Sequence, residues 1–394
     1  MLTCRAARDA PIVEREAWFR RFRLVSLLQT SVNHIMATPH PALVRAEAFC
    51  KRFGLRVPIL MAPMASASPP SLAIAVAKAG GLGALGALPL KPEAIRQWAS
   101  DTRAGTNGAF QVNLWIPDPP PRRDPEHEAR VRAFLGQWGP AVPAEAGDAK
   151  PVDFAAQCDA LLEAGPAIVS SIMGLYPPEF VARMKARGIA WFANVTTVAE
   201  ARAAEAAGAD VVVAQGMEAG GHRGAIDQAL AERDCVGLFA LLPAVVDAVR
   251  VPVVATGGIG DARGVAAALL LGASAVQIGT ALLRCPEAKV PAGWADALAR
   301  TPPEGTLLTR AFSGRAGRTV ATAYARAATA PEAPAPAPYP VQRALTQAMR
   351  DQAGKDGDGE RMQAWAGQSA AMARAVPAEQ LVRELWDGAQ QLLS

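Results

Sequence analysis

The chain contains few of the residues that build disulfide and metal sites: five cysteines and four histidines among 394 residues. The cysteines are odd in number and far apart, with no Cys-x-x-Cys pair, which argues against a disulfide framework or a zinc site. A reducing, cytoplasmic compartment is the natural interpretation. Carboxylates do not cluster at metal-ligand spacing, and there is no Gly-x-x-x-x-Gly-Lys-Ser/Thr loop and no Gly-x-Ser-x-Gly elbow. We therefore predict no metal ion.

The chain also lacks a strong excess of positive or negative charge, and it lacks long apolar runs. Charged residues make up 19% of the chain, and the net charge of +4 is spread without a long Lys/Arg block, which argues against a nucleic-acid partner. No apolar run reaches the roughly 20 residues that span a bilayer, so we predict no membrane partner. Apolar residues make up 51%, enough for one large α/β domain with an appendage.

The first 40 residues contain one stretch that bears on targeting. Arginines in the stretch 20–23, followed by a short apolar segment at 24–28, faintly resemble a twin-arginine export signal. The apolar segment is short and polar residues interrupt the sequence after it, so export is only the alternative. We expect residues 1–40 to form a poorly ordered extension, with the functional protein beginning near Met36.

From residue 57 onward, short apolar runs alternate with helix-like segments. Eight such strands, separated by helices, predict a parallel sheet closed into a (β/α)8 barrel over residues 41–283, with a doubly wound open sheet as the alternative. The predicted strands are 57–64, 82–88, 108–115, 167–173, 190–195, 209–215, 251–256 and 275–278. The predicted helices are 69–79, 152–164, 177–187, 197–207, 238–249 and 261–271.

The remaining segments are less regular. We predict a long surface loop at 117–130, which is charged and rich in proline. The C-terminal segment, 284–394, is mixed up to 330 and then runs extended through the proline-rich stretch 331–340. Beyond it we predict two or three helices that form a cap near the active site. Their apolar faces contain Leu345, Met349, Met362, Trp365, Leu381, Leu385 and Trp386.

Two glycine-rich turns follow the last two predicted strands. The turn at 257–260 precedes a helix that Asp261 is expected to cap, and the turn at 277–280 follows the eighth strand. Phosphates bind at this position in (β/α)8 barrels, because backbone amides there are not covered by side chains. Tight turns without a ligand are the alternative.

The loop at 216–224 carries His222 among closely spaced glycines, directly after the sixth predicted strand. An imidazole at the carboxyl end of a barrel strand is placed for proton transfer, although an exposed turn histidine is the alternative. Asn113 and Gln215 end other strands, and their carboxamides suit the polar edge of an isoalloxazine ring. Met64 is polarizable and suits contact with a flat ring.

These stretches resemble the nitronate monooxygenase family, formerly called 2-nitropropane dioxygenase. The similarity runs from about residue 57 to the C-terminus, and the Glu-Ala-Gly-Gly-His loop is its most specific element. The motifs that carry it are 58–65, 215–224, 257–259, 277–280, 312–315, 338–340 and 365–368.

The resemblance implies an FMN-dependent (β/α)8 enzyme that oxidises alkyl nitronates, such as propionate 3-nitronate, with O2 to carbonyl compounds and nitrite or nitrate. It implies His222 as the catalytic base, with the small nitronate and O2 as partners. For the assembly we expect a monomer or a homodimer. With Met64 and Gly221 added from the local pattern, the expected FMN-binding residues are Met64, Asn113, Gln215, Gly220, Gly221, Gly258, Gln277, Ile278, Gly279 and Thr280.

Two stretches depart from the family pattern. Residues 172–174 replace an aromatic residue and a histidine, and 317–319 replace an Ala-Arg-Gly sequence. We expect both to line the substrate pocket. The alternative function is an NAD(P)H-dependent FMN reductase of enoyl thioesters or quinones on the same barrel, and an idle flavin-binding scaffold is a third interpretation.

Overall fold

Eight parallel strands form one sheet that closes on itself. The computed structural model describes residues 39–65 and 67–394, so the predicted extension and export signal lie almost wholly outside the described residues. The strand order is β1-β9-β8-β6-β5-β4-β3-β2, and a parallel bridge between Leu60 and Leu82 joins the two ends of the order. The strands are β1 (Ile59–Met61), β2 (Gly83–Gly86), β3 (Phe110–Trp115), β4 (Ile168–Ile172), β5 (Ala190–Val195), β6 (Val211–Gln215), β8 (Val253–Thr256) and β9 (Ala275–Ile278). The predicted (β/α)8 barrel is confirmed.

Helices cover the outside of the barrel, and local signals set their ends. Gly80, with φ 101°, ends α3, and the Asp261 side chain accepts the amide hydrogens of Arg263 and Gly264 to begin α10. The helices are α2 (Pro41–Phe53), α3 (Pro70–Ala79), α4 (Pro92–Gly105), α6 (Phe154–Ala164), α7 (Pro178–Lys185), α8 (Val198–Ala206), α9 (Leu238–Ala248) and α10 (Ala262–Leu270). The sequence did not indicate α2 or α4.

The barrel interior is closed at its amino-terminal end. Alternate strand residues such as Leu60 and Phe192 point inward, because successive side chains of a strand face opposite sides. Phe49 and Phe53 of α2 join this inner cluster, and the ring of Phe53 lies edge-on to Phe192 at 5.0 Å. Arg52 pairs with Asp210, which immediately precedes β6. The opposite, carboxyl-terminal end of the barrel is therefore the end available for a site.

The last helix, α15 (Ala378–Leu393), belongs to the barrel. Its residues Leu381, Val382 and Leu385 are buried in the barrel's main apolar cluster, and α15 packs against α10 and α3. Among the described residues, only two single-turn 3-10 helices, at Thr280–Leu282 and Pro286–Ala288, come between β9 and the cap helix α11 (Ala292–Arg300), so α15 completes the outer layer. The predicted C-terminal cap, residues 284–394, is therefore only partly a cap. Its last helix, α15, packs on the barrel, and the elements before α15 form the cap.

The cap is built around the short three-stranded sheet β10-β11-β7, where β7 is the His222 loop itself. In the antiparallel pairing of β7 with β11, Gly317 lies opposite His222. The cap elements are β7 (Gly221–His222), β10 (Thr306–Thr309), β11 (Gly317–Val320), α5 (Pro125–Leu135), α11 (Ala292–Arg300), α12 (Ala323–Ala327), α13 (Val341–Leu345) and α14 (Gln347–Asp356). The proline-rich stretch 331–340 is not helical, as predicted.

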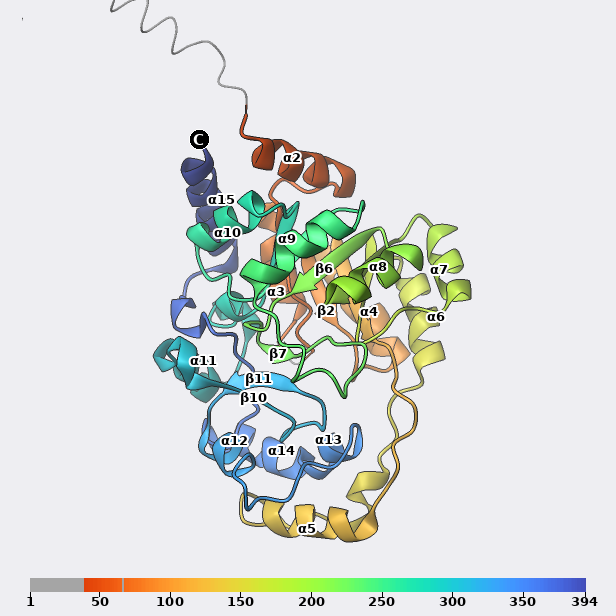
Figure 1. Cartoon of the computed structure of the whole chain (residues 1–394), viewed down its shortest axis with the longest axis vertical. Coiled ribbons are helices and arrows are strands. Elements are labelled where there is room, and N and C mark those ends of the chain that lie inside the picture. Colours follow the sequence, from red (N-terminus) through yellow and green to blue (C-terminus); the bar gives the residue numbers. More distant parts are fainter. Residues whose placement is uncertain (1–38, 66) are drawn as a thin grey trace, which may run out of the picture. The chain divides into compact units, whose positions relative to one another are not determined.

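Two predictions for this region were wrong. Residues 117–130 are not all surface loop, because α5 begins at Pro125 with Asp124 as its cap. Helix α5 buries Val131 and Leu135 in one apolar cluster with residues of α13 and α14, and Figure 1 shows these helices together. Residues around Trp365 are not helical, since Trp365 forms an antiparallel bridge with Thr319. Within the described part of the chain, every helix is too short or too polar to cross a bilayer.

Candidate active site

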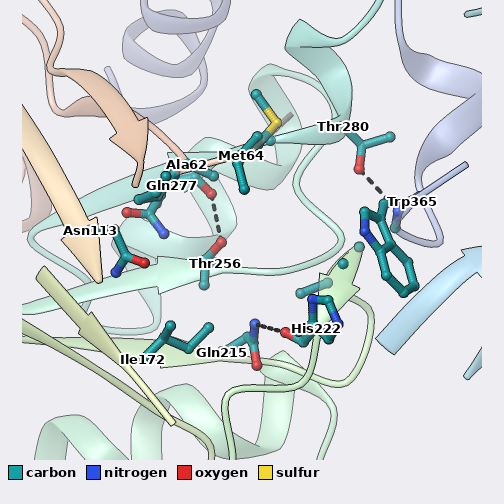
Figure 2. A pocket seen from close by; sticks show the side chains of 18 of the residues that line it. Ala62, Met64, Asn113, Ile172, Gln215, His222, Thr256, Gln277, Thr280 and Trp365 are labelled. Atoms are coloured by element: carbon teal, nitrogen blue, oxygen red, sulfur yellow. Dashed lines mark hydrogen bonds between the residues drawn. The ribbon is translucent and has the colours of Figure 1, made fainter. Parts of the chain in front are cut away.

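The predicted base and the ten predicted cofactor residues all line one cavity at the carboxyl ends of the strands. Its volume is about 230 Å³, and Figure 2 shows side chains that line it. The sequence separates these residues by up to 216 positions, and the barrel brings them together because all its strands end at the same rim. They are Met64, Asn113, Gln215, Gly220, Gly221, His222, Gly258, Gln277, Ile278, Gly279 and Thr280.

The turns after β8 and β9 present bare backbone to the cavity. Gly257 and Gly258 have φ of 118° and 69°, which disfavours any side chain. Among the described residues, no acceptor is hydrogen-bonded to the amides of Gly258, Ile259 or Gly279. The first turn of α10 is different, because Asp261 already caps it. The amides left for an anion are thus those of the two turns.

The cap reaches these turns through the segment 367–369. The amide of Gly367 donates to Oγ1 of Thr280 at 3.0 Å, as Figure 2 shows. A Cβ added to Gly220 would lie 2.4 Å from the Gly367 nitrogen, so this approach requires glycine. The Thr280 hydroxyl keeps its own hydrogen to donate into the cavity.

The Gln215 carboxamide holds the histidine loop. Its Nε2 donates to the carbonyl oxygen of His222 at 3.0 Å, and its Oε1 accepts the amide hydrogen of Gly224 at 2.7 Å (Figure 2). Arg223 also fixes this loop, since its buried guanidinium donates to the Gln215 carbonyl oxygen at 2.6 Å. Most of the hydrogen-bonding capacity of Gln215 is therefore used within the protein.

Asn113 and Gln277 keep more of their capacity. Nδ2 of Asn113 donates to Oγ of Ser170 at 3.1 Å, and Oε1 of Gln277 accepts from Nε2 of Gln111 at 3.2 Å. No other side-chain hydrogen bond of these two carboxamides is found among the described residues. The Asn113 oxygen and the Gln277 amide group remain to contact a ligand.

His222 lies between two tryptophans. The rings of Trp115 and Trp365 stand edge-on to the imidazole, with centroids 4.5 Å and 4.7 Å away. Nε2 lies 2.7 Å from Oγ of Ser313. Ring contacts and one hydrogen bond thus hold the imidazole in a single orientation.

Burial, and after it the positive charges of Arg343, Arg315 and Arg350 in that order, together lower the pKa of His222 from 6.5 to about 3. Burial penalises the charged imidazolium, and nearby cations repel it. The imidazole is therefore neutral at ordinary pH and can accept a proton.

Among the described residues that line the cavity, Arg343 and Arg350 are the charged side chains. No carboxylate within the described residues pairs with either, and Arg350 instead donates to the Gln363 oxygen at 3.0 Å. Burial, followed by repulsion from Arg343, lowers the pKa of Arg350 to about 10. Two cations without a carboxylate make this part of the cavity attractive to an anion.

Sequence reasoning missed several cavity residues. Asn194 ends β5 as Asn113 ends β3, and that signal could have found it. The others come from the cap or follow a strand without a polar pattern. The missed residues include Trp115, Asn194, Trp294, Arg343, Arg350 and Trp365.

One expectation about the departures from the family pattern was wrong. Ile172 does line the cavity, but 317–319 do not. Arg318 is buried behind the cavity and donates to the Met217 carbonyl oxygen at 2.9 Å. In the described residues, no three His, Cys, Asp or Glu side chains lie together as metal ligands.

The fold and the cavity define the class first: a (β/α)8 enzyme with bare amides after its last two strands and a neutral imidazole facing them. Comparison with known proteins then gives the family. Residues 47–388 match the family described as nitronate monooxygenase. The chain belongs to this family, and it is an oxidoreductase.

Individual relatives support this assignment over nearly their whole length. The nitronate monooxygenase of Paraburkholderia phytofirmans is 39% identical over 345 residues, covering 86% of this chain and 94% of the relative. That of Pseudomonas aeruginosa is 39% identical over 349 residues, covering 86% and 98%. The solved structure of a nitroalkane oxidase from Streptomyces ansochromogenes is 38% identical, with a TM-score of 0.78 over 86% of this chain and 98% of that one.

Proposed function

We propose that this enzyme uses FMN to oxidise alkyl nitronates with O2, giving carbonyl compounds and nitrite or nitrate. The observation that carries the proposal is the neutral His222 in a cavity that also contains two arginines, neither of which pairs with a carboxylate of the described residues. A nitronate is an anion formed when a nitroalkane loses its α-proton. One wall of the cavity can thus attract the anion, and the histidine can generate it.

FMN fits the donor set of the barrel wall. Bare amides at Gly258 and Gly279 and the hydroxyl of Thr280 suit a phosphate. The oxygen of Asn113 and the amide of Gln277 suit the polar edge of a flavin ring, and Met64 suits its face. When bound, FMN supplies the redox chemistry, whereas the protein supplies position and charge.

His222 is the proposed base. The lowered pKa leaves the imidazole neutral, with a free lone pair, at physiological pH. This lone pair can accept the α-proton of a neutral nitroalkane. The nitronate anion formed beside the ring would raise the pKa of His222, because an opposite charge favours the imidazolium. The positive charge that stabilises a nitronate comes from Arg343 and Arg350 instead of an imidazolium. Tryptophan rings pack against the imidazole on both sides and orient it for the proton transfer.

The experiment is direct. Purified protein should be yellow and should release about one FMN per chain on denaturation, and nitronate should stimulate its oxygen uptake with formation of nitrite or nitrate. A colourless protein that cannot be reconstituted with FMN would remove the cofactor proposal. Nicotinamide-dependent reduction of an enoyl thioester or quinone, without nitronate oxidation, would favour the alternative reductase.

A further inference from the structure

The partner of His222 is a hydroxyl that is itself fixed on both sides. Oγ of Ser313 lies 2.7 Å from Nε2 of His222, 3.2 Å from the carbonyl oxygen of Arg315 and 3.3 Å from its amide nitrogen. Ser313 is fully buried, so bulk solvent does not compete for these contacts. Within the described residues, the hydroxyl therefore has these three hydrogen-bonding neighbours and no other.

Counting hydrogens identifies the tautomer of His222. A hydroxyl donates one hydrogen and accepts two. All three contacts are satisfied when Ser313 donates to the Arg315 carbonyl oxygen and accepts from both the Arg315 amide and Nε2–H. If Ser313 donated to Nε2 instead, the contact with the carbonyl oxygen would have no hydrogen. The arrangement in which all three contacts have a hydrogen places the imidazole proton on Nε2 and leaves Nδ1 unprotonated.

Nothing in the described part of the chain hydrogen-bonds to Nδ1 of His222. Its lone pair is therefore available to a substrate. Because the imidazole is neutral, only one of its two nitrogens can be basic, and the partner of the other nitrogen decides which.

A buried ion pair holds the turn that carries Ser313. Nε of Arg315 donates to Oδ2 of Asp118 at 2.8 Å, and Nη2 donates to Oδ1. Nη1 donates to the carbonyl oxygen of Ala225 at 3.3 Å. The side chain of Arg315 is 2% exposed and that of Asp118 is 14% exposed. One guanidinium thus joins the segment after β3, the segment after His222 and the Ser313 turn, with the fixed geometry of a bidentate pair.

We propose that Asp118, Arg315 and Ser313 are positioning residues for His222: the ion pair fixes the Ser313 turn, and Ser313 keeps the proton on Nε2 so that Nδ1 accepts the substrate proton. The kinetic part rests on the proposed function, whereas the tautomer does not. The chain offers a matched control in the ion pair of Arg310 with Glu232, at 2.9 Å. The Arg310 guanidinium also holds this turn through the Gly314 carbonyl oxygen, but the pair is more exposed, and neither of its side chains hydrogen-bonds to the Ser313 hydroxyl or to the His222 imidazole.

The first test is NMR of the imidazole nitrogens in holoenzyme with isotope-labelled histidine, with the His222 signals assigned by their loss in His222→Asn. We expect a neutral ring protonated at Nε2, a mixture of tautomers in Ser313→Ala and a smaller shift toward that mixture in Asp118→Asn. Glu232→Gln should match the wild type. A proton on Nδ1 in the wild type, or an unchanged spectrum in Ser313→Ala, would overturn the proposal. Ser313→Ala decides the matter even if Asp118→Asn does not fold.

The second test is kinetic. Ser313→Ala should lower kcat for a neutral nitroalkane by about 10–100-fold, by analogy with the cost of removing the hydrogen-bond partner that orients a metal-bound histidine. KM and the rate with preformed nitronate should change by less than about threefold, and Ser313→Thr should restore most of the loss because it keeps the hydroxyl. Equal losses with both substrates would contradict the positioning role. Failure of the wild type to oxidise any nitronate would contradict the proposed function. The NMR result would then be the only test of whether Ser313 sets the tautomer of His222.

Discussion

The two walls of the cavity differ in their chemistry. The barrel wall consists mainly of glycine turns, carboxamides, a methionine and the indole of Trp115, and among the described residues His222 is its one ionisable side chain. The cap wall, within the described residues, contributes Arg343, Arg350 and the indoles of Trp294 and Trp365. A wall of backbone amides suits a cofactor, whereas a wall of cations and aromatic rings suits the choice of a small anionic substrate.

His222 belongs to both walls. It follows β6 of the barrel, and Gln215 holds its loop there, yet its backbone pairs with β11 of the cap. We therefore expect that changes in the barrel wall alter cofactor binding, that changes in the cap wall alter substrate binding, and that changes at His222 alter the chemistry itself.

The largest effect is expected at His222. His222→Asn should retain FMN and lose about 10²–10⁴-fold in activity on neutral nitroalkanes, the usual value of a positioned general base. Activity on preformed nitronates should fall less, because the proton has already gone. Steady-state kinetics with both substrates measures this, and His127→Asn, at an exposed histidine that contacts Ala335, is the control. Equal losses with both substrates would assign His222 to binding or structure.

The barrel wall is tested at Gly279. A Cβ there would lie 3.3 Å from Cβ of Ala62 and 3.5 Å from Sδ of Met64, and its φ of −112° tolerates a side chain. Gly279→Leu should weaken FMN binding by about 10–100-fold through overpacking of about 1–3 kcal/mol, while the fold is kept. Fluorescence titration with FMN and circular dichroism check both points, with Gly354→Ala as the control in open space. Normal FMN affinity in Gly279→Leu would contradict the proposal that the turn after β9 binds FMN.

The cap wall is tested at Arg343. Arg343→Gln should raise KM for nitronate by about tenfold, because a hydrogen bond to a charged group contributes about 1.5 kcal/mol or more. FMN affinity and kcat should stay within about twofold. Lys355→Gln removes the same charge from an exposed position of α14 and should change nothing. Weakened FMN binding in Arg343→Gln would contradict the assignment of cofactor binding to the barrel wall and substrate binding to the cap wall.

The smallest effect is expected from pH. Burial keeps the pKa of His222 near 3, so the basic form persists as the pH falls and is lost only close to that value. The kcat for a neutral nitroalkane should therefore change by less than about twofold between roughly pH 8 and pH 5. An unperturbed histidine would lose most of its basic form over the same range. A pH–rate profile with its lower limb near 6.5 would contradict the buried, neutral base.

The barrel could be predicted from sequence because its signals are local. Continuous apolar runs such as that of β6, and turn residues such as Gly80 and Asp261, set strands and helix ends without reference to the rest of the chain. Each predicted site residue ends a strand or lies in a loop that follows one. Common placement at the barrel rim was enough to bring them into one cavity.

The cap could not be predicted because its order comes from contacts distant in sequence. Strand β7 has only two residues and exists because β11 pairs with it from nearly a hundred residues away. Arg343 and Arg350 lie on short cap helices whose place over the barrel is set by packing against α5. Periodic patterns in the sequence do not predict contacts of this kind. The sequence analysis therefore missed the two arginines of the cap wall.

The central claim is that the substrate itself, and not a nicotinamide, reduces the flavin. Holoenzyme mixed anaerobically with excess propionate 3-nitronate tests this most directly, with flavin absorbance as the readout. We predict that the absorbance of the oxidised flavin is lost during mixing with nitronate and persists for minutes with NADH or NADPH. Rapid loss with a nicotinamide and none with nitronate would contradict the account and identify a reductase.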